Sequence, residues 1–434
     1  MTTNNTGQQV ESLREPGGGG DLTVKLTRVV DLSLVTMAGM TLNDYLQRVQ
    51  GCFYHQNGDG LADLISFRDP HVMSSRLMLE KPERDVERCV DPSLAEFIAG
   101  HLRAVWAAGS GDCVEAWKTQ MVIVQAVARF MQELKEERWM LPIMYTACLD
   151  LRLFALAADY ELTRSGTSKA GETLEKSAEA LMSCFRVCAA DTRTGEDCTK
   201  RWGLLYLVNQ FFKIYFKINK LNLCKPMIRA IEALSFKDRF SLSQLITYKY
   251  YTGRKDMFDS DFKSADSTLS FAFQRCHIGS RKNKRRILIY LIPVKMLRGY
   301  LPKQSVLERY NLSEFHDVVA SVRQGNVRLL SETLAKHESF FIGAGIYLIL
   351  EKLKILAFRN LFKKVYHISG THQIEVAMFL QSLKWMCVED VDLDETECIL
   401  ANMINDGRMK GYISHAHRKV VVSKKDAFPP LTAC

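Results

Sequence analysis

The sequence predicts an all-α protein made of helical hairpins, stacked in the manner of tetratricopeptide (TPR) repeats, that ends in a small winged helix. Two observations support this fold class. From Thr41 to about Ala190, apolar residues recur at helical spacing and the alternating pattern of strands is absent. From about Thr371 to Lys425, the pattern is helix, helix and β-hairpin, which is the order of elements in a winged helix.

The first 38 residues are expected to form a disordered N-terminal extension. They are polar and include four consecutive glycines, Gly17 to Gly20, so they offer too little apolar area to offset the entropy lost on ordering. The organised region begins at Thr41, where Thr41 and Asp44 resemble a capping box. The apolar stripe that follows consists of Leu42, Tyr45, Leu46 and Val49.

We expect N-terminal helical repeats over residues 39–200, a second set over 201–350, a winged helix over 351–425 and a tail over 426–434. Helix pairs joined by short polar turns indicate a stacked-hairpin solenoid. Small residues that favour close approach of two helices in a TPR-type hairpin recur at Gly253, Ala265, Leu269 and Ala272.

Aromatic residues are dense after Trp202. They would suit base stacking, but they fall on faces apolar enough to need burial, so packing between helices is the favoured interpretation. The residues are Tyr206, Phe211, Phe212, Tyr215 and Phe216.

Positive charge is concentrated in one region of the chain. The formal net charge is +9, and residues 213–309 hold 21 Lys and Arg against 7 Asp and Glu. Such a surplus indicates an acidic partner, either nucleic acid or an acidic protein. Five cations stand together on an expected turn, where they would contact phosphates, form a localisation signal or be simply solvated; they are Arg281, Lys282, Lys284, Arg285 and Arg286.

The winged helix is predicted in more detail. The apolar segment 345–368 should be one long helix that packs against both the solenoid and the winged helix. Asp394 and Glu397 fit a capping box at the start of the second helix, and Gly407 fits its left-handed end. Two β-prone runs around a basic tip then predict the hairpin that forms the wing.

The second helix of the winged helix is acidic where a DNA reader would need cations. Its start carries Asp390, Asp392, Asp394, Glu395 and Glu397, which repel phosphates, so base-specific reading is not expected. Cations around the wing suit contacts with the nucleic-acid backbone or docking of a protein; they are Arg408, Lys410, Arg418, Lys419, Lys424 and Lys425.

His415 and His417 alternate on an expected strand and would share one face. A phosphate contact, an idle solvent-facing pair and a metal or catalytic pair are the three interpretations, the last being the least favoured.

No catalytic residue, metal or cofactor is expected. Nucleotide-binding, nucleophile-elbow and zinc-protease motifs are missing from the sequence, and the twelve cysteines include no CxxC pair. No run of 18 or more apolar residues appears, so no membrane association is expected. Reduced thiols in a soluble protein made in the cytosol are the prediction.

The chain resembles the PCI domains, named for the proteasome lid, the signalosome and translation initiation factor 3. The Gln373–Lys384 run, the step from Met403 to Ile413 and the Val420–Val422 strand carry the resemblance. Within them the chain is similar to the signalosome-subunit-12-like family, on the strings YKYYTGRKDMFDSDFKSA, KNKRRILIYLIPVKML, LEKLKILAFRNLFKKVY and VEDVDLDETECILANMI.

The resemblance implies a non-catalytic subunit of the transcription and export complex 2, in the nucleus at the nuclear pore with some in the cytoplasm. It implies a hetero-oligomer with a Sac3/GANP-type scaffold and a short acidic disordered protein shared with the proteasome lid. It also implies binding of RNA and double-stranded DNA without sequence preference, coupling transcription to mRNA export. The alternative is a structural PCI subunit of a lid-like or signalosome-like assembly that binds no nucleic acid.

Overall fold

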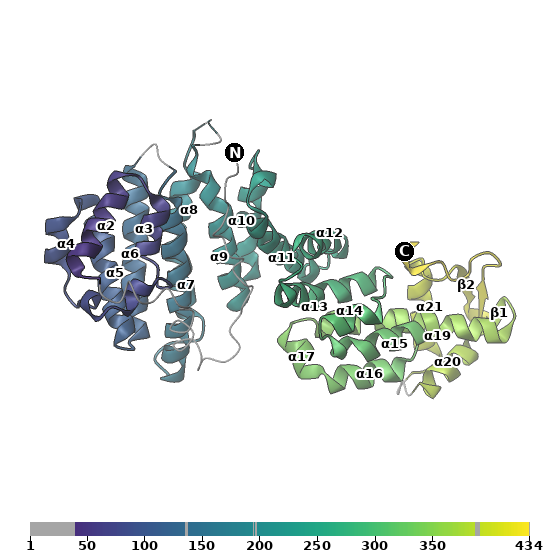
Figure 1. Cartoon of the computed structure of the whole chain (residues 1–434). Coiled ribbons are helices and arrows are strands. Elements are labelled where there is room, and N and C mark those ends of the chain that lie inside the picture. The colour runs from purple at the N-terminus through teal and green to yellow at the C-terminus, as the bar shows by residue number, and fades with distance from the viewer. Residues whose placement is uncertain (1–39, 135–137, 194, 196–197, 387–390, 434) are drawn as a thin grey trace. The chain divides into compact units, whose positions relative to one another are not determined.

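The structure is a computed structural model that describes residues 40–433 apart from 135–137, 194, 196–197 and 387–390 (Figure 1). The described residues form two compact units, 40–248 and 249–433, and each is described by itself. Both are helical, and the second ends in a winged helix, so the predicted fold class is confirmed. The division between the two units falls within α11 (Leu242–Phe258), past the expected boundary at 200/201. The boundaries of the subdomains stay a prediction. The expected N-terminal extension lies outside the described residues.

The first unit is a series of helices that pack each on the next. Consecutive helices from α5 to α10 are neighbours in space, and α8 also packs on α6. The bounds are α2 (Leu42–Tyr54), α3 (Gly58–Leu64), α4 (Glu83–Cys89), α5 (Pro92–Gly109), α6 (Cys113–Glu133), α7 (Leu141–Arg164), α8 (Glu172–Ala189), α9 (Leu204–Lys217) and α10 (Cys224–Glu232).

Local sequence signals fix the start of this unit. Thr41 and Asp44 form the predicted capping box, with the Asp44 amide 3.2 Å from Thr41 Oγ1, and Tyr45, Leu46 and Val49 are buried beneath it. The aromatic residues of α9 pack between helices, as predicted: Tyr206, Phe211, Phe212 and Tyr215 are buried, and Phe216 is half-buried.

Helix α7 is long and apolar enough to cross a bilayer by length and composition alone. However, 78% of its apolar window is buried inside the protein. Neighbouring helices α3, α6, α8 and α9 cover it, which is the arrangement of a core helix.

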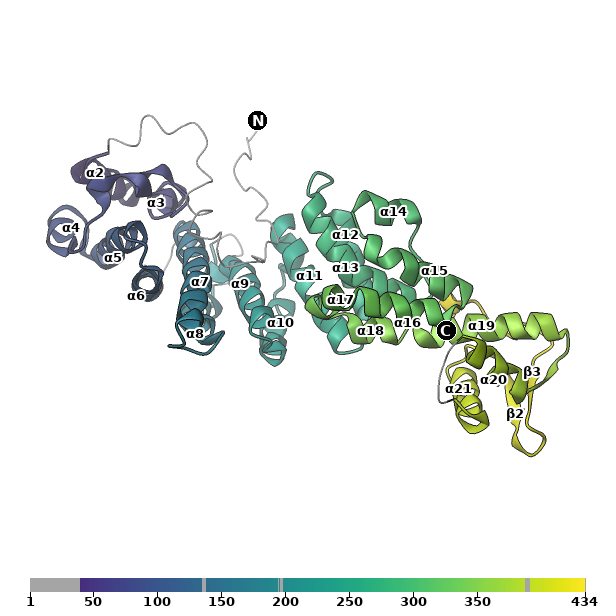
Figure 2. The same ribbon diagram turned by 90° about the horizontal axis from the view of Figure 1, so that it is seen from below.

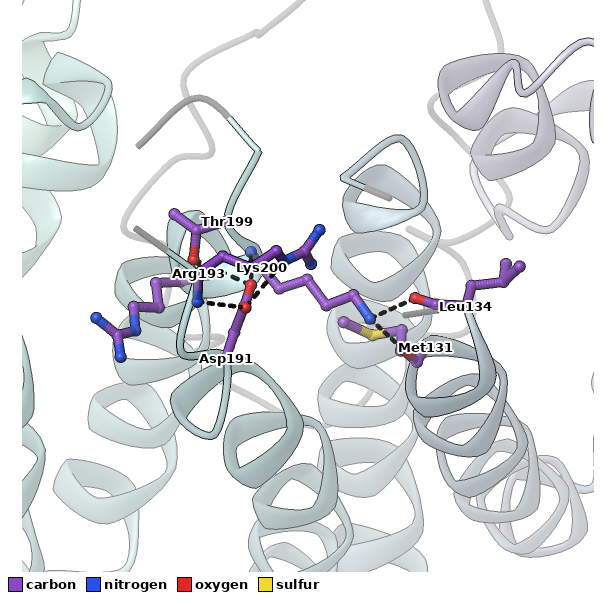
Figure 3. Close-up of polar contacts among 7 residues, drawn as sticks. Met131, Leu134, Asp191, Arg193, Thr199 and Lys200 are labelled. Carbon is purple, nitrogen blue, oxygen red and sulfur yellow. Dashed lines mark hydrogen bonds and ion pairs between the residues drawn. The ribbon is translucent and has the colours of Figure 1, made fainter. Parts of the chain in front are cut away.

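A buried polar cluster fixes the connection from α8 to α9 (Figure 3). Lys200, in the short helix η3 (Lys200–Gly203), is 4% exposed and donates to the carbonyls of Met131 and Leu134 at the end of α6. Burial acts to raise the pKa of Asp191, but hydrogen bonds from the Arg193 side chain and the Lys200 amide outweigh it and lower the pKa to about 2. The loop is therefore held by its own polar groups as well as by apolar packing.

The second unit continues with hairpins of shorter helices. Its bounds are α12 (Phe262–Arg275), α13 (Arg281–Leu297), α14 (Gln304–Arg309), α15 (His316–Gln324), α16 (Val327–Lys336), α17 (Glu338–Gly343), α18 (Tyr347–Glu351) and α19 (Lys354–Ser369). A Cβ at Gly253 would lie 2.6 Å from the Leu269 side chain, and Ala265, Leu269 and Ala272 are buried, so these small residues do permit the predicted close approach.

The expected long helix over 345–368 is wrong in one respect, because it breaks at Lys352 and Leu353 into α18 and α19. Its predicted role is confirmed: α19 packs against α15 and α16 of the helical hairpins and against α20 of the winged helix.

The winged helix consists of β1 (Gln373–Glu375), α20 (Val376–Trp385), α21 (Leu393–Asn405), β2 (Gly411–Ser414) and β3 (Lys419–Val422). The strands form an antiparallel sheet in the order β1-β3-β2, visible at one end of the unit in Figure 2. Strand β1 was not predicted. The tail crosses back over the helices, where Arg359 donates to the carbonyls of Phe428 and Pro429 at 2.9 and 2.5 Å.

The capping box assigned to Asp394 and Glu397 is wrong. The N-cap of α21 is Asp392, whose Oδ1 accepts from the Glu395 amide at 2.8 Å. Asp394 and Glu397 already lie within the helix, so their carboxylates are directed to other partners. The predicted left-handed glycine at the end of α21 is confirmed, with Gly407 at φ +70°.

Candidate nucleic-acid interface

The tip of the wing is a turn rather than a continuation of its strands. His415, Ala416 and His417 form the short helix η7, and Arg418 follows in the left-handed region at φ +48°. The expectation that His415 and His417 share one face of a strand is therefore wrong, because strand β2 ends at Ser414.

Side chains at the tip bind back onto the first turns of α21. Arg418 Nη1 lies 2.5 Å from Asp394 Oδ1 and 3.2 Å from Glu397 Oε1. His415 Nδ1 lies 2.6 Å from Glu397 Oε2. The hydrogen bond from Arg418 lowers the pKa of Asp394 below its usual value. The acidic start of the helix is thus neutralised in part by the wing itself.

The predicted repulsion between this helix and phosphates has a structural counterpart. Asp392 caps the helix, Asp394 and Glu397 bind the wing, and Glu395 is exposed with no ion pair to any described residue. Asp390 lies outside the described residues. Carboxylates thus occupy the turn of the helix that would enter a major groove.

The other wing cations fall into two groups. Arg408 lies 3.5 Å from Asp406, and Lys410 lies 3.2 Å from Asp426. Within the described part of the chain, Lys419, Lys424 and Lys425 have no carboxylate partner; the last two are exposed and Lys419 is half-buried. His417 is also exposed. We call Lys419, Lys424 and Lys425 the wing lysines.

The five clustered cations at 281–286 lie on a helix, so the expected turn is wrong. They form the first turns of α13, which begins at Arg281. Only Arg281 and Lys282 are exposed. Lys284 is buried and donates to the Phe273 carbonyl at 2.9 Å with its ammonium over the Phe273 ring.

The remaining two cations of this cluster are less exposed than Arg281 and Lys282. Arg285 donates to the Asn311 carbonyl at 3.2 Å and lies 3.5 Å from Glu314. Arg286 is half-buried. In both views, α12 and α13 lie at one end of the unit and the sheet at the other, so the structure does not join the two predicted basic sites (Figures 1 and 2).

Two other polar features occur in the first unit. A hollow of about 630 Å³ between α4, α5 and α6 is lined by charged side chains that pair on its rim, among them Glu83 with Arg103. Deeper inside, His71 and His101 are buried with their Nε2 atoms 2.9 Å apart. Among the residues that the structure describes, no group of three His, Cys, Asp or Glu side chains is placed to hold a metal ion.

The charged residues of the wing were predicted from the sequence, but the ion pairs that they form were not. The signal was present as charge complementarity, since Asp394 and Glu397 stand one turn apart on α21 and a short basic tip follows. No local sequence pattern, however, indicates which cations these two carboxylates bind.

Residues 334–424 match the PCI domain family, a range that begins in α16 and ends just after β3. Helical hairpins that run into a winged helix, together with this match, define a PCI domain protein. Proteins of this class act as scaffold-type, generally non-catalytic subunits of hetero-oligomeric complexes.

Similar proteins extend the match beyond this domain. The chain is 55% identical to PCI domain-containing protein 2 of Xenopus laevis over 92% of its own length and 100% of that protein. It is 48% identical to the Drosophila melanogaster homolog over 90% of this chain and 99% of that one. Protein CSN12 homolog of Schizosaccharomyces pombe is 29% identical over 90% of this chain and 96% of that one. The chain therefore belongs to the PCI domain-containing protein 2 family, as the resemblance predicted.

Proposed function

We propose that the protein is a non-catalytic adaptor of the transcription and export complex 2. In this role it binds RNA and DNA without sequence preference, jointly with a Sac3/GANP-type PCI scaffold. It thereby couples transcription to mRNA export at the nuclear pore, with a fraction of the protein in the cytoplasm.

The observation that carries the proposal is the unpaired state of the wing lysines. Binding that depends on charge releases counterions from phosphates, so it is favoured most by cations not already neutralised by the protein's own carboxylates. Lys419, Lys424 and Lys425 meet this condition among the described residues, whereas Arg418 and His415 are engaged with α21. An acidic second helix beside free lysines favours contact with the backbone over reading of bases.

The acidic partner belongs to the same proposal. The surplus of positive charge over residues 213–309 suits the short acidic protein shared with the proteasome lid. Arg281 and Lys282 are the members of the basic cluster available for it, because they are the two of the five that are exposed. Lys284 and Arg285 donate to carbonyls of the protein, and Arg286 is half-buried.

The test is a triple charge reversal of the wing lysines, Lys419→Glu, Lys424→Glu and Lys425→Glu, in the full chain. Affinity for labelled RNA and for duplex DNA should fall alike. The slope of log K against log salt should also flatten, by about 0.7 to 0.9 units for each phosphate that the variant no longer neutralises. Arg418 is left intact, because its replacement would also release the tip of the wing from α21.

A matched control separates a local effect from the change in net charge. Lys81, Lys169 and Lys336 are exposed lysines elsewhere on the chain, and their reversal to Glu changes the net charge by the same amount. The control should keep most of the affinity and the wild-type salt slope. Unchanged binding by the triple variant of the wing lysines would remove them from the interface.

A structural subunit of a lid-like or signalosome-like assembly, without nucleic-acid binding, is the second candidate. Two observations favour it: three of the six predicted wing cations are engaged in intramolecular ion pairs, and one relative is named Protein CSN12 homolog. Purification from nuclease-treated nuclear extract distinguishes the two. Recovery of lid or signalosome subunits with no export scaffold would favour this candidate over the first.

A further inference from the structure

The sheet of the winged helix has one buried face and one open face. On its inner face, Val420 of β3 lies between Ile374 of β1 and Ile413 of β2, and Ile374 and Val420 are buried. On its outer face, Val421 lies between Gln373 and Tyr412. Because residues in register point to the same side of a sheet, Tyr412, Val421 and Gln373 form one row across the outer face.

Tyr412 is the exposed aromatic residue of this row. Its side chain is 62% exposed, and it makes no hydrogen bond or ring contact with any described residue. A single exposed aromatic residue is common on protein surfaces and alone indicates nothing. What distinguishes Tyr412 is the charge on either side of it.

Two lysines flank Tyr412 on the same face. The Ser423 amide donates to the Lys410 carbonyl at 2.8 Å, so the pairing of β2 with β3 extends one residue further and places Lys410 two residues before Tyr412. On the neighbouring strand, Lys419 lies two residues from Val421 and therefore diagonal to Tyr412. We call Lys410, Tyr412 and Lys419 the stacking face.

The acidic residues near this face are few and lie at its margins. Glu375 is the register partner of Lys419 on β1, which is the far side of β3 from Tyr412. Asp426 pairs with Lys410 at 3.2 Å, with both side chains about half exposed. An ion pair in solvent is weak, so a phosphate can replace Asp426 as the partner of Lys410.

We propose that the stacking face binds single-stranded nucleic acid, with one base stacked on the Tyr412 ring and the two lysines contacting the adjoining phosphates. The inference rests on the proposed function and specifies its substrate class. An aromatic side chain between cations is the arrangement by which proteins bind single strands without sequence preference, since every base has a flat face. In a duplex those faces are covered by neighbouring base pairs, so the tyrosine distinguishes single strands from duplexes.

The test compares Tyr412→Ala with Tyr412→Trp in the full chain. The probes are a 12-nucleotide single-stranded RNA, the same sequence as single-stranded DNA, and the corresponding DNA duplex. Tyr412→Ala should weaken binding of both single strands about 5- to 150-fold, the range expected when one base no longer stacks on an aromatic ring. Duplex affinity and the salt slope should stay unchanged because tyrosine carries no charge.

Tyr412→Trp keeps a flat ring at the same position. Its single-strand affinity should equal or exceed that of the wild type, and stacking should quench its added indole fluorescence. Trp385→Ala is the matched control, since Trp385 is a 74% exposed aromatic residue at the end of α20 and not on the sheet. This control should bind as the wild type does. Because Tyr412 is exposed on the outer face, its removal should leave the fold intact.

The outcomes separate this inference from the function on which it rests. Unchanged single-strand binding by Tyr412→Ala, with weaker binding on reversal of the wing lysines, would overturn the stacking and leave the adaptor function in place. An equal weakening on the duplex, or with Trp385→Ala, would also overturn the stacking. If a protein that co-purifies with the wild type is lost from Tyr412→Ala while RNA binding stays intact, the stacking is overturned and this face docks a protein instead. A wild-type chain that binds no nucleic acid would overturn both.

Discussion

Arg418 Nη1 lies 2.5 Å from Asp394 Oδ1, so the tip of the wing is bound to the first turn of α21. This ion pair changes how the basic tip is interpreted, because Arg418 is held by two carboxylates, Asp394 and Glu397, and is less available for phosphate than a lysine without a carboxylate partner. It also explains why α21 can carry so many acidic residues beside a basic wing.

Replacing Arg418 with Gln should loosen the tip of the wing without unfolding the domain. Asp394 and Glu397 would lose the cation they share, and His415 alone would remain to bind Glu397. Amide hydrogen exchange should accelerate over residues 414–419 and change little in α19. Lys419→Gln is the control, since it removes a neighbouring charge that has no carboxylate partner among the described residues. Equal protection of the tip in Arg418→Gln and the wild type would show that the ion pair is dispensable.

The buried imidazoles predict acid sensitivity of the first unit. Burial, with a further contribution from the charge of His71, lowers the pKa of His101 well below its usual value. Asp69 Oδ1 lies 2.9 Å from His71 Nδ1, and His71 Nε2 lies 2.9 Å from His101 Nε2. With Asp69 ionised, this geometry assigns His71 Nδ1 as the donor to Asp69, and one of the two facing Nε2 atoms donates to the other.

The sign of the effect follows from linkage. Because the pKa of His101 is lower in the folded state, the unfolded chain binds a proton there below about pH 6.5 and the folded chain does not. Stability should therefore fall as the pH drops from 7 to 5, with this residue contributing up to about 1.4 kcal/mol per pH unit.

Urea unfolding at pH 7.0 and 5.5 measures this. His101→Gln can keep a donor toward His71 but does not titrate, so the difference in stability between the two pH values should shrink. An identical pH dependence of stability in His101→Gln and the wild type would contradict the lowered pKa of His101 as its cause.

Gly325 lies at the junction between the helical hairpins and α19, and no larger residue should be tolerated at this position. It ends α15 at φ +66°, and a Cβ there would lie 2.4 Å from the Leu361 amide nitrogen and 2.8 Å from the Asn360 carbonyl carbon. Gly325→Ala should cost about 3 kcal/mol or more, since the left-handed backbone and a clash with backbone atoms add together.

Gly370 provides the comparison for that substitution. It ends α19 at φ +62°, but a Cβ there would meet no atom within 4 Å. Gly370→Ala should therefore cost only the strain of the backbone, about 1–2 kcal/mol. Similar decreases in unfolding free energy for the two variants would mean that α19 can move away from Gly325.

The parts of the fold that the sequence predicted depend on neighbours along the chain. Residues close together in the chain specify three of these features: the capping box at Thr41, the left-handed Gly407 and the hairpin around 415–418. Strand β1 was missed because three residues followed at once by a helix carry no periodicity, and their partners on β3 lie far along the chain.

The candidate site was predicted in composition but not in geometry, for the same reason. Arg418 and Asp394 are 24 residues apart, and Lys284 binds a carbonyl 11 residues before it. A run of cations shows where charge is available, whereas the fold decides which members are already paired. Tyr412 required the register of the sheet, which sets its outer face and its lysine neighbours.

Lys200 should contribute more to the free energy of unfolding than any exposed lysine of the first unit. Its ammonium donates to the carbonyls of Met131 and Leu134, the latter at 2.6 Å, at the end of α6 where carbonyls have no partner within the helix (Figure 3). Lys200→Met keeps most of the apolar stem but leaves both carbonyls, of buried Met131 and half-buried Leu134, without this donor. Unfilled acceptors of this kind cost about 1–3 kcal/mol each, so we expect a decrease of about 2–4 kcal/mol in the urea-derived free energy of unfolding. Lys169→Met, at an exposed lysine, should change it by less than about 0.5 kcal/mol. A decrease below about 1 kcal/mol for Lys200→Met would mean that water reaches these carbonyls and replaces the ammonium.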